Sequence, residues 1–472
     1  MSVKSRNVYL YIFFAFSLLL ITSLIIITIT NITITNKEPI SAETDLNIKK
    51  INITILNSWG DQNIKNKTLN SLLEKYMENN PNIHIVNISL YDEDFYIKMQ
   101  TDFASGYEPD IISTFPNNNI KILFINNKIA GLNAELQNDV EWHNSIDKSI
   151  IHFVTTNSQI YGIPTEVDYI AMYINTDLFN QYNVQIPTDY NQLKTAVLTF
   201  ANNHIIPIAF GSQDNSLLLY QAIVASLGGY LNLEHAINNM VVDKSYIEAF
   251  SYVKELKDLN AFPKNFENMG RKESKQLFLE KSAAMIVEDS SFIGDIENMD
   301  DKNSRSLIST KYIDSDSVEI IPFPAINTHP LIDKKYLNTD KQKFYSFSPM
   351  IFGAGESTFF VSQSAYTEKK EEVIKFLKYL TSPDTTNEFY KNTMYMTAIK
   401  IPPSKVPNSS LITKRNLLIN SISEFTPMPN NIIDQMVWQS IIKSQFNNVI
   451  NGTVDASYIW NEAITLSNKI HN

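Results

Sequence analysis

Aromatic rings stand close to short polar side chains at several places where a strand should end. Trp59 precedes Asp61 by two residues, Phe115 precedes Asn117 by the same spacing, and Trp438 lies in an amphipathic stretch near the C-terminus. A flat ring can pack on the apolar face of a pyranose, while a carboxylate or amide can hydrogen-bond its hydroxyl groups. These residue types are therefore typical of carbohydrate recognition. Core packing is the alternative for each tryptophan.

Carboxylates also occur in two short acidic motifs. Thr165-Glu166-Val167-Asp168-Tyr169 begins a buried strand, and Glu288-Asp289 ends another. Glycoside hydrolases use two carboxylates roughly 5–10 Å apart, one on each side of the bond that is cleaved. Residues two apart on a strand share one face and adjacent residues diverge, so neither motif flanks a bond from both sides. No G-x-S-x-G, P-loop or G-x-G-x-x-G motif is present either, and we predict no catalytic residues.

The composition excludes several other classes of protein. Hydrophobic residues make up 44% and charged residues 19% of the 472 residues, which is typical of a globular chain with about two or three domains. The formal net charge of -11 argues against nucleic-acid binding, which needs clustered cations. The chain has no cysteine, and its seven histidines form no metal-binding motif. We therefore expect no metal and no cofactor.

The order of periodic segments predicts an α/β fold. Alternating isoleucines over 51–55 predict a first strand, and residues 83–86, 109–112 and 206–210 have the pattern of further strands. Helical periodicity is found at residues 68–77, 95–104, 190–202, 217–227, 245–259, 368–380, 436–446 and 456–468. Alternating strands and helices form parallel βαβ units, whose ligands bind beyond the carboxyl ends of the strands. Trp59 would lie at such an end.

The first 30 residues differ from the rest of the chain. Two basic residues precede a run from Val8 to Thr30 that contains no charge. A helix of about 20 apolar residues can cross a hydrocarbon core, whereas the apolar part of a signal peptide spans about 7–15 residues. We predict a membrane anchor at residues 1–30, with the bulk of the chain outside, and a polar linker at 31–47. Cleavage near Ile40-Ser41-Ala42, which would give a secreted protein, is the alternative.

The stretch from Ser158 to Phe179 is the segment around which the chain is organised. Its sequence, S-Q-I-Y-G-I-P-T-E-V-D-Y-I-A-M-Y-I-N-T-D-L-F, resembles the "YGIP … YN … L" signature of family 1 extracellular solute-binding proteins. These are the maltose-binding-like receptors of ABC importers. Pro109-Asp110-Ile111 and the segment F-L-E-K-S-A-A-M-I-V-E-D-S-S-F, which ends at Phe292, resemble further motifs of that family. The resemblance covers residues 48–468, although Lys281 replaces a glycine of the family pattern.

The resemblance implies further ligand-binding residues. Asp168 matches the position of a carboxylate that holds sugar hydroxyls in the maltose-binding relatives. Residues that follow the A-A-M strand contact ligand in the family, which implies roles for Glu288 and for Phe292, the latter in place of a tryptophan. Tyr169 and Tyr220 are weaker candidates. For each of these residues the alternative is a core or solvated position.

The resemblance also implies a two-lobed fold of the periplasmic-binding-protein type (type II, maltose-binding-like). We expect lobe 1 to comprise residues 48–165 and 325–382, and lobe 2 to comprise residues 166–324 and 383–472. About 27 residues after Pro324 are predicted to form an excursion loop. Trp59 and Asp168 would then bind one ligand from opposite lobes, which close by bending at the hinge.

The expected function is capture of a carbohydrate outside the cell membrane. The partners would be a sugar or oligosaccharide, the permease subunits of an ABC transporter, and the membrane that holds the N-terminal helix, but no nucleic acid. A membrane-tethered sensor or adhesion module on the same fold is the main alternative. A glycoside hydrolase is less favoured, because nothing in the sequence requires catalysis.

Overall fold

The computed structural model describes residues 50–61, 63–214, 216–299, 311–326, 349–402, 409–422 and 425–471. The chain divides into Met1–Ile51 and Asn52–Asn472, and the elements described below belong to the second unit, apart from the first residue of β1. The predicted anchor at residues 1–30 and the linker at 31–47 lie outside the described residues. Among the residues that are described, no helix is long and apolar enough to cross a membrane.

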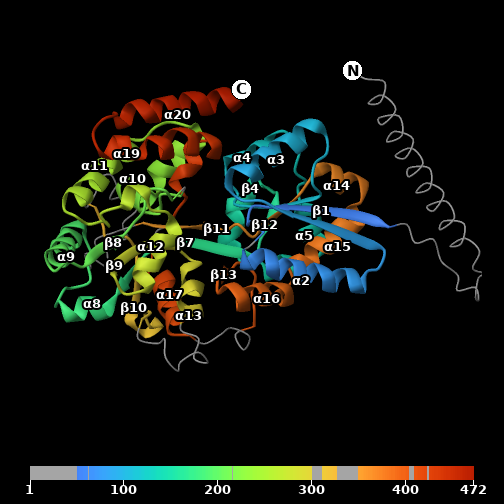
Figure 1. Ribbon diagram of the computed structural model, residues 1–472. Coiled ribbons are helices and arrows are strands. Elements are labelled where there is room, and N and C mark those ends of the chain that lie inside the picture. The colour runs from blue at the N-terminus through green and yellow to red at the C-terminus, as the bar shows by residue number, and fades with distance from the viewer. Residues whose placement is uncertain are drawn as a thin grey trace, which may run out of the picture. The chain divides into compact units, whose positions relative to one another are not determined.

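The first sheet has five strands in the order β2-β1-β3-β12-β6 (Figure 1). Their bounds are β1 (Ile51–Asn57), β2 (Ile83–Ser89), β3 (Ile111–Ser113), β6 (Gly162–Pro164) and β12 (Thr358–Val361). β1 and β3 are parallel, as the alternation of strands and helices predicts. β12 runs antiparallel to both β3 and β6, so the sheet is mixed.

Helices cover both faces of this sheet. Leu56, Ile112 and Phe360 pack on the side of α3 (Asp92–Ser105) and α4 (Asn118–Ile125). The alternate positions Ile55, Ile111 and Phe359 point the other way, because successive side chains of a strand lie on opposite faces. That second face is covered by α2 (Ile64–Asn79), α15 (Lys370–Leu380) and α16 (Pro383–Thr393). We call this sheet and its helices the first lobe.

The second sheet is built around one long strand, β7 (Glu166–Asn175). The strand order is β14-β11-β7-β9-β8, and β10 and β13 also pair with β7. The bounds are β8 (Ile206–Ala209), β9 (Ala283–Asp289), β10 (Val318–Ile321), β11 (Met350–Ala354), β13 (Met396–Thr397) and β14 (Phe425–Thr426). All ten residues of β7 are buried, because Ile170 and Met172 pack into one hydrophobic core and Tyr169 and Tyr173 into another.

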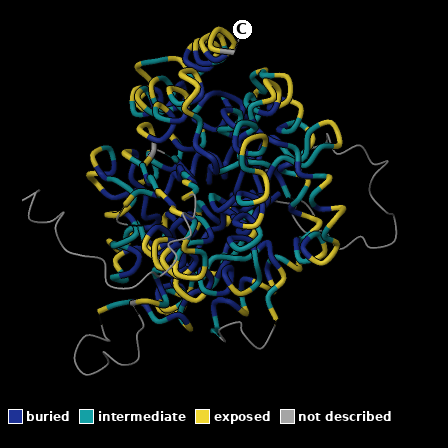
Figure 2. The backbone as a smooth tube through the Cα atoms, turned by 90° about the vertical axis from the view of Figure 1, so that its right-hand side faces the viewer, coloured by how far each residue is buried: buried dark blue, intermediate teal, exposed yellow. Residues whose placement is uncertain are grey.

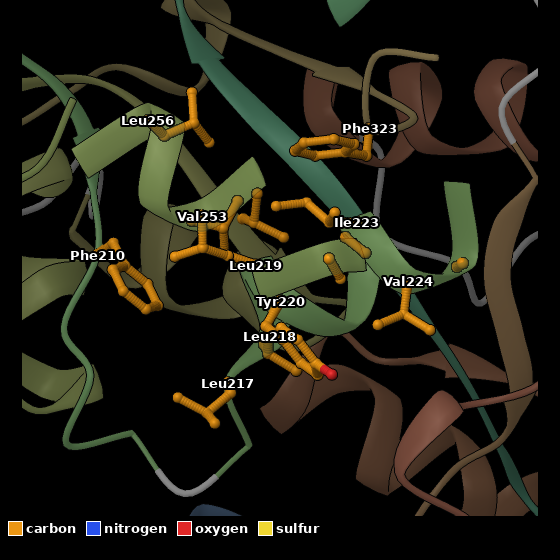
Figure 3. Packing of buried hydrophobic residues seen from close by; sticks show 14 of the residues in the cluster. Phe210, Leu217, Leu218, Leu219, Tyr220, Ile223, Val224, Val253, Leu256 and Phe323 are labelled. Atoms are coloured by element: carbon orange, nitrogen blue, oxygen red, sulfur yellow. The ribbon is translucent and has the colours of Figure 1, made fainter. Parts of the chain in front are cut away.

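The larger core of this second lobe lies between α9 (Tyr190–Asn202), α10 (Leu218–Asn239), α11 (Lys244–Asp258) and α20 (Ala456–His471). Figure 3 shows Leu219 and Ile223 of α10 near Val253 of α11, with Phe210 at the margin of the cluster. Figure 2 shows buried residues in the interior of the fold and exposed residues on its outer turns. The predicted helical periodicity is confirmed for these four helices.

Shorter elements complete the two lobes. They are α5 (Asn133–Asn138), α6 (Val140–Ser145), α7 (Lys148–Ile151), η1 (His152–Val154), β4 (Thr155–Thr156), β5 (Gln159–Ile160), α8 (Thr176–Gln181), η2 (Phe266–Asn268), α12 (Arg271–Leu279), α13 (Phe292–Met299), η4 (Ser315–Ser317), α14 (Gln363–Glu368), α17 (Ser410–Ser421), η7 (Pro429–Ile432), α18 (Gln435–Val437), η8 (Trp438–Lys443) and α19 (Ser444–Ile450).

The chain passes between the two sheets at three places: between β6 and β7, between β11 and β12, and between α16 and β13. The first lies at the predicted boundary after residue 165. The others differ from the prediction, because β11 pairs with β7 and so belongs to the second sheet. The predicted return at residue 383 also comes too early, since α16 packs against α2 of the first lobe. Neither assignment could be made locally, because the partners are far away in sequence.

Candidate functional site

A cavity of about 650 Å³ is lined by residues of both lobes. Ligand pockets for small molecules are typically about 300–1,000 Å³. The ring-bearing residues in its lining are Tyr91, Tyr96, Phe115, Phe153, Tyr169, Phe352, Tyr395 and Trp438, and its charged residues are Lys65, Glu166, Asp168, Asp214, Arg271, Lys275, Asp289, Asp295 and Glu356. We call this cavity the cleft. Its size and its mixture of rings and polar groups suit a small polar ligand.

The first lobe contributes residues that follow β1 and β3. Ser58 comes directly after β1, and its buried hydroxyl group has no hydrogen-bond partner within the described part of the chain. Phe115 and Asn117 follow β3 at the edge of the sheet where ligands of parallel strands bind. The Asn117 side chain accepts a hydrogen bond from the Ile120 backbone amide (3.4 Å) and donates one to the Tyr96 hydroxyl (2.7 Å). Asn117 thus caps α4 and positions a ring of the cleft.

Asp168 on β7 is a buried carboxylate in the lining of the cleft. Its Oδ1 accepts hydrogen bonds from the Tyr169 amide (2.8 Å), the Ser290 amide (3.1 Å) and the Ser290 hydroxyl (2.6 Å). No described residue bonds to Oδ2. Burial, together with the charges of Asp289 and Glu166, raises the pKa of Asp168 to about 8. The protonated carboxyl group can therefore both donate to a ligand hydroxyl and accept from one at neutral pH.

Arg271, the first residue of α12, is fixed by two carboxylates at the end of β9. Its Nε lies 3.1 and 3.0 Å from the two oxygens of Glu288, and its Nη2 lies 2.5 Å from both Glu288 and Asp289. Burial acts to raise the pKa of Asp289, but the charges of Arg271 and Lys275 outweigh it and hold that pKa well below its usual range. The guanidinium is thereby oriented, and its Nη1 makes no hydrogen bond to the described residues.

Lys65 in the first turn of α2 joins the three crossings between the lobes. Its Nζ lies 2.9 Å from Glu166, 3.2 Å from Glu356 and 4.0 Å from the centre of the Tyr395 ring. Each of these three residues lies at a different crossing. Burial opposes the charged form of Lys65, yet the two carboxylates raise its pKa well above the usual value. We call Lys65 the hinge lysine, because its ammonium group contacts all three connecting segments.

The structure brings five of the ten predicted site residues to the cleft. They are Phe115, Asn117, Asp168, Tyr169 and Trp438. Trp438 begins η8 and is 1% exposed, so most of its ring belongs to the core of the second lobe. Tyr169 is likewise buried, and its hydroxyl lies 3.4 Å from that of Tyr173. Only parts of these two rings are therefore within reach of a ligand.

Trp59 and Asp61 do not line the cleft, which corrects the prediction that Trp59 and Asp168 share one ligand. The Trp59 ring is 1% exposed and packs edge-on against Phe359 (6.4 Å between ring centres) and Phe389 (5.9 Å). Asp61 is exposed. The physical reason is alternation at the end of β1: Ser58 faces the cleft, so its neighbour faces the core beneath α2 and α16.

Tyr220, Glu288 and Phe292 also lie away from the lining of the cleft. The Tyr220 hydroxyl donates to the Tyr246 carbonyl (2.5 Å) and accepts from the Trp460 indole (2.9 Å), so its hydrogen bonds are made within the core. Figure 3 shows Tyr220 among apolar side chains of this core. Phe292 is fully buried against Tyr173 and other rings. Glu288 is not part of the lining but accepts a hydrogen bond from Arg271 and thereby orients it. The neighbouring Asp289 is the residue of this pair that lines the cleft.

Sequence reasoning missed the cations of the cleft, Lys65, Arg271 and Lys275. One signal was available, because Glu166 and Glu288 occur within apolar strands and a buried carboxylate needs a cationic partner. The sequence does not indicate which lysine or arginine fills that need, since the partners of Glu166 and Glu288 come from helices at different distances along the chain.

No group of three or more histidine, aspartate or glutamate side chains with metal-binding geometry is found among the described residues. The absence of a metal and of a cofactor stays a prediction. The acidic pair considered for hydrolysis is already engaged, since Glu166 accepts from Lys65 and from the Ser357 hydroxyl (2.5 Å), and Asp168 accepts from Ser290. Glu166 thus has both carboxylate oxygens engaged within the protein, and Asp168 has one.

Comparison with known proteins agrees with this geometry. A multiple sugar-binding protein of Streptococcus mutans is 21% identical over 332 residues, which cover 68% of this chain and 70% of that protein. A chitin oligosaccharide binding protein has a similar structure (TM-score 0.73, 17% identity, 90% of this chain and 99% of that one). So does a sugar transporter protein from Bacillus licheniformis in complex with stachyose (TM-score 0.67, 16% identity, 89% and 100%). The family model for bacterial extracellular solute-binding proteins matches residues 60–387, and the chain therefore belongs to that family.

Proposed function

We propose that this protein captures a carbohydrate in the cleft and delivers it to the membrane subunits of an ABC importer. The observation that carries the proposal is the cleft itself, in which aromatic rings from both lobes surround polar atoms without protein partners. Support comes from the sugar-binding relatives, one of which is described with stachyose bound. Family membership supports an extracytoplasmic location and a binding rather than a catalytic role.

The proposed roles within the cleft follow from the contacts of each side chain. Phe115 offers an apolar face to the sugar ring, and Trp438, which is 1% exposed, contributes only an edge. Asp168 Oδ2, Ser58 Oγ and Arg271 Nη1 provide a carboxyl group, a hydroxyl and a donor that described residues leave unused. The apolar rings alone would not suffice, because sugar hydroxyls that are buried in the cleft without hydrogen-bond partners would weaken binding.

We further propose that the lobes close on the ligand by bending at the three crossings. In this scheme the first lobe comprises residues 52–165 and 356–393, and the second comprises residues 166–354 and 396–471. Closure brings Ser58 and Phe115 of the first lobe toward Asp168 and Arg271 of the second. A ligand can drive this change only if it binds the closed form more tightly than the open one.

Residues 1–30 are proposed to hold the protein on the outer face of the cell membrane. The support is the uncharged run from Val8 to Thr30 and the two basic residues that precede it. Full-length protein is then expected in the membrane fraction, and its intact mass should include this segment. A mature chain that begins near Glu43 would show secretion instead.

Calorimetric titration of the full chain tests the proposed function. The protein should be purified in a detergent without a sugar head group, so that the detergent cannot compete for the cleft. Raffinose, stachyose, xylotriose and triacetylchitotriose are suitable probes. We expect one of them to bind with one-to-one stoichiometry and to raise the melting temperature, because a ligand of the folded state stabilises it. The proposal would be refuted if none of these probes bound and if no acidic or amino saccharide tested beside them bound either.

A further inference from the structure

The lining of the cleft contains more acidic than basic side chains. Six of its side chains are carboxylic acids, namely Glu166, Asp168, Asp214, Asp289, Asp295 and Glu356, whereas three are cationic, namely Lys65, Arg271 and Lys275. Acidic clusters on a protein surface are common, so this excess decides nothing by itself. The contacts of the cations and of the buried polar atoms are what give it meaning.

Each cation in the lining already has two carboxylate neighbours. Lys65 lies between Glu166 and Glu356. Arg271 lies between Glu288 and Asp289, both at 2.5 Å from Nη2.

The third cation, Lys275, is paired in the same way. Its Nζ lies 2.8 Å from Asp295 and 3.9 Å from Glu288. A ligand anion would therefore meet cations whose charge is compensated in advance, and it would also approach the compensating carboxylates. In the described lining, no cation is without a carboxylate neighbour.

Two deeply buried polar groups of the lining show what kind of partner is missing. Ser58 is 8% exposed, and its hydroxyl oxygen has no hydrogen-bond partner within the described residues. Asp168 is 7% exposed and uses only Oδ1 for its contacts with the protein. A hydroxyl and a carboxyl oxygen can accept hydrogen bonds from a sugar hydroxyl or an ammonium group. Both groups can also donate a hydrogen bond, so they require a polar ligand, and the charge of that ligand is selected by the ion pairs described above.

We infer that the cleft selects its saccharide by charge, admitting neutral or amino-bearing sugars and rejecting sugars that carry a carboxylate or phosphate group. This inference rests on the proposed function and specifies the substrate class of the same site. An anionic sugar would have to enter a partly desolvated space beside several like charges, where Coulomb repulsion is stronger than in water. A neutral sugar incurs no such cost, and an ammonium group is attracted.

The direct test compares sugars that differ in charge but hardly in shape. Suitable probes are (1→4)-linked galactotriose against trigalacturonate, and glucose against glucosamine and glucuronate. Titrations of the full chain at neutral pH should show each acidic member binding at least about tenfold more weakly than its neutral partner, whereas the amino member should bind at least as tightly. Equal or tighter binding of an acidic member would overturn the inference while leaving sugar capture intact. If no sugar binds at all, the proposed function fails and this inference fails with it.

Charge-removing variants test whether these carboxylates cause the discrimination. Asp295→Asn removes a partly exposed carboxylate of the lining and leaves Lys275 with one carboxylate partner fewer. We expect the ratio of neutral to acidic affinity to fall about threefold to tenfold in this variant. Glu356→Gln, which keeps the size of a side chain beside Lys65, should act in the same direction. Glu108→Gln is the matched control, because Glu108 pairs with Lys128 and does not line the cleft.

The outcome of the variant series is decided by the ratio of affinities and not by either affinity alone. A folding defect in Glu356→Gln would appear as a lower melting temperature without ligand, and Asp295→Asn then provides the independent reading. Discrimination that is unchanged in both lining variants, or changed equally in Glu108→Gln, would show that the charge of the cleft is not responsible.

Discussion

Replacing the hinge lysine should destabilise the protein more than replacing any surface lysine. Lys65→Met keeps the length of the side chain but removes its ammonium group. The side chains of Lys65 and Glu166 are 2% and 6% exposed, so the variant leaves a buried carboxylate without its cation. Glu356, which is 26% exposed, also loses its partner.

The size of the effect follows from the burial of this pair. Removing one partner of a buried ion pair typically costs about 3–5 kcal/mol of unfolding free energy, because the other charge stays desolvated. The entropy of unfolding is about 2.1 cal/mol/K per residue, or roughly 0.8 kcal/mol/K for the about 380 described residues. The melting temperature of Lys65→Met should therefore fall by about 4–6 °C. A second change, Glu166→Gln, should recover part of this loss, because it removes the unpaired charge.

Thermal unfolding followed by calorimetry, at neutral pH and without ligand, is the assay. Lys254→Met is the matched control, since Lys254 forms an exposed ion pair with Asp258 one helical turn away. Such exposed pairs contribute about 0–1 kcal/mol, so the control should melt within about 1 °C of the wild type. Burial raises the pKa of Glu356 even though Lys65 opposes this, so the deficit of Lys65→Met should shrink as the pH is lowered. Equal melting temperatures for Lys65→Met and Lys254→Met would refute the reasoning.

Three further predictions concern single side chains. The pKa of Asp168 is about 8 in the folded protein, above the value of about 3.9 in an unfolded chain, so the folded state retains a proton that the unfolded state has lost. The stability of the wild type relative to Asp168→Asn should therefore fall as the pH rises from about 4 to about 8, and a difference that is flat in urea titrations across this range would count against it. Trp59→Ala should lower the unfolding free energy by about 3–5 kcal/mol through loss of core packing. The sugar affinity of the folded variant, measured by calorimetry, should stay within about twofold of wild type. A larger loss of affinity would show that Trp59 contacts the ligand. Phe115→Ala should weaken sugar binding about tenfold with little change in melting temperature, whereas Tyr107→Ala, which removes an exposed ring outside the cleft, should change neither.

The fold could be predicted from the sequence to a large extent, because its signals are local. Alternating isoleucines in β1, the apolar run of β7 and the amphipathic periodicity of α15 are readable without knowledge of their partners. β11 was the main omission, because its five residues follow a long polar stretch and the strand with which it pairs is about 180 positions earlier. α16 was missed for a related reason, since its polar sequence becomes helical against α2.

The candidate site was harder to predict, because a residue reaches the ligand only if its side chain points into the cleft. Ser58 and Trp59 are neighbours with opposite surroundings, and the sequence favoured the larger ring. Asp168 was found because the family pattern marks its position, whereas Arg271 depends on contacts between a helix and a strand end that no short motif encodes. The prediction was thus best where a residue's surroundings follow from its own strand.

The position of β12 between β3 and β6 has a consequence for the order in which the protein can acquire its structure during synthesis. β12 joins β6 to the rest of the first sheet, and β12 is the only described strand with which β6 pairs. Contacts between residues this far apart form late and slowly, because a long loop must close before they are made. The amino-terminal 350 or so residues therefore emerge from the ribosome without the strand that completes their first sheet.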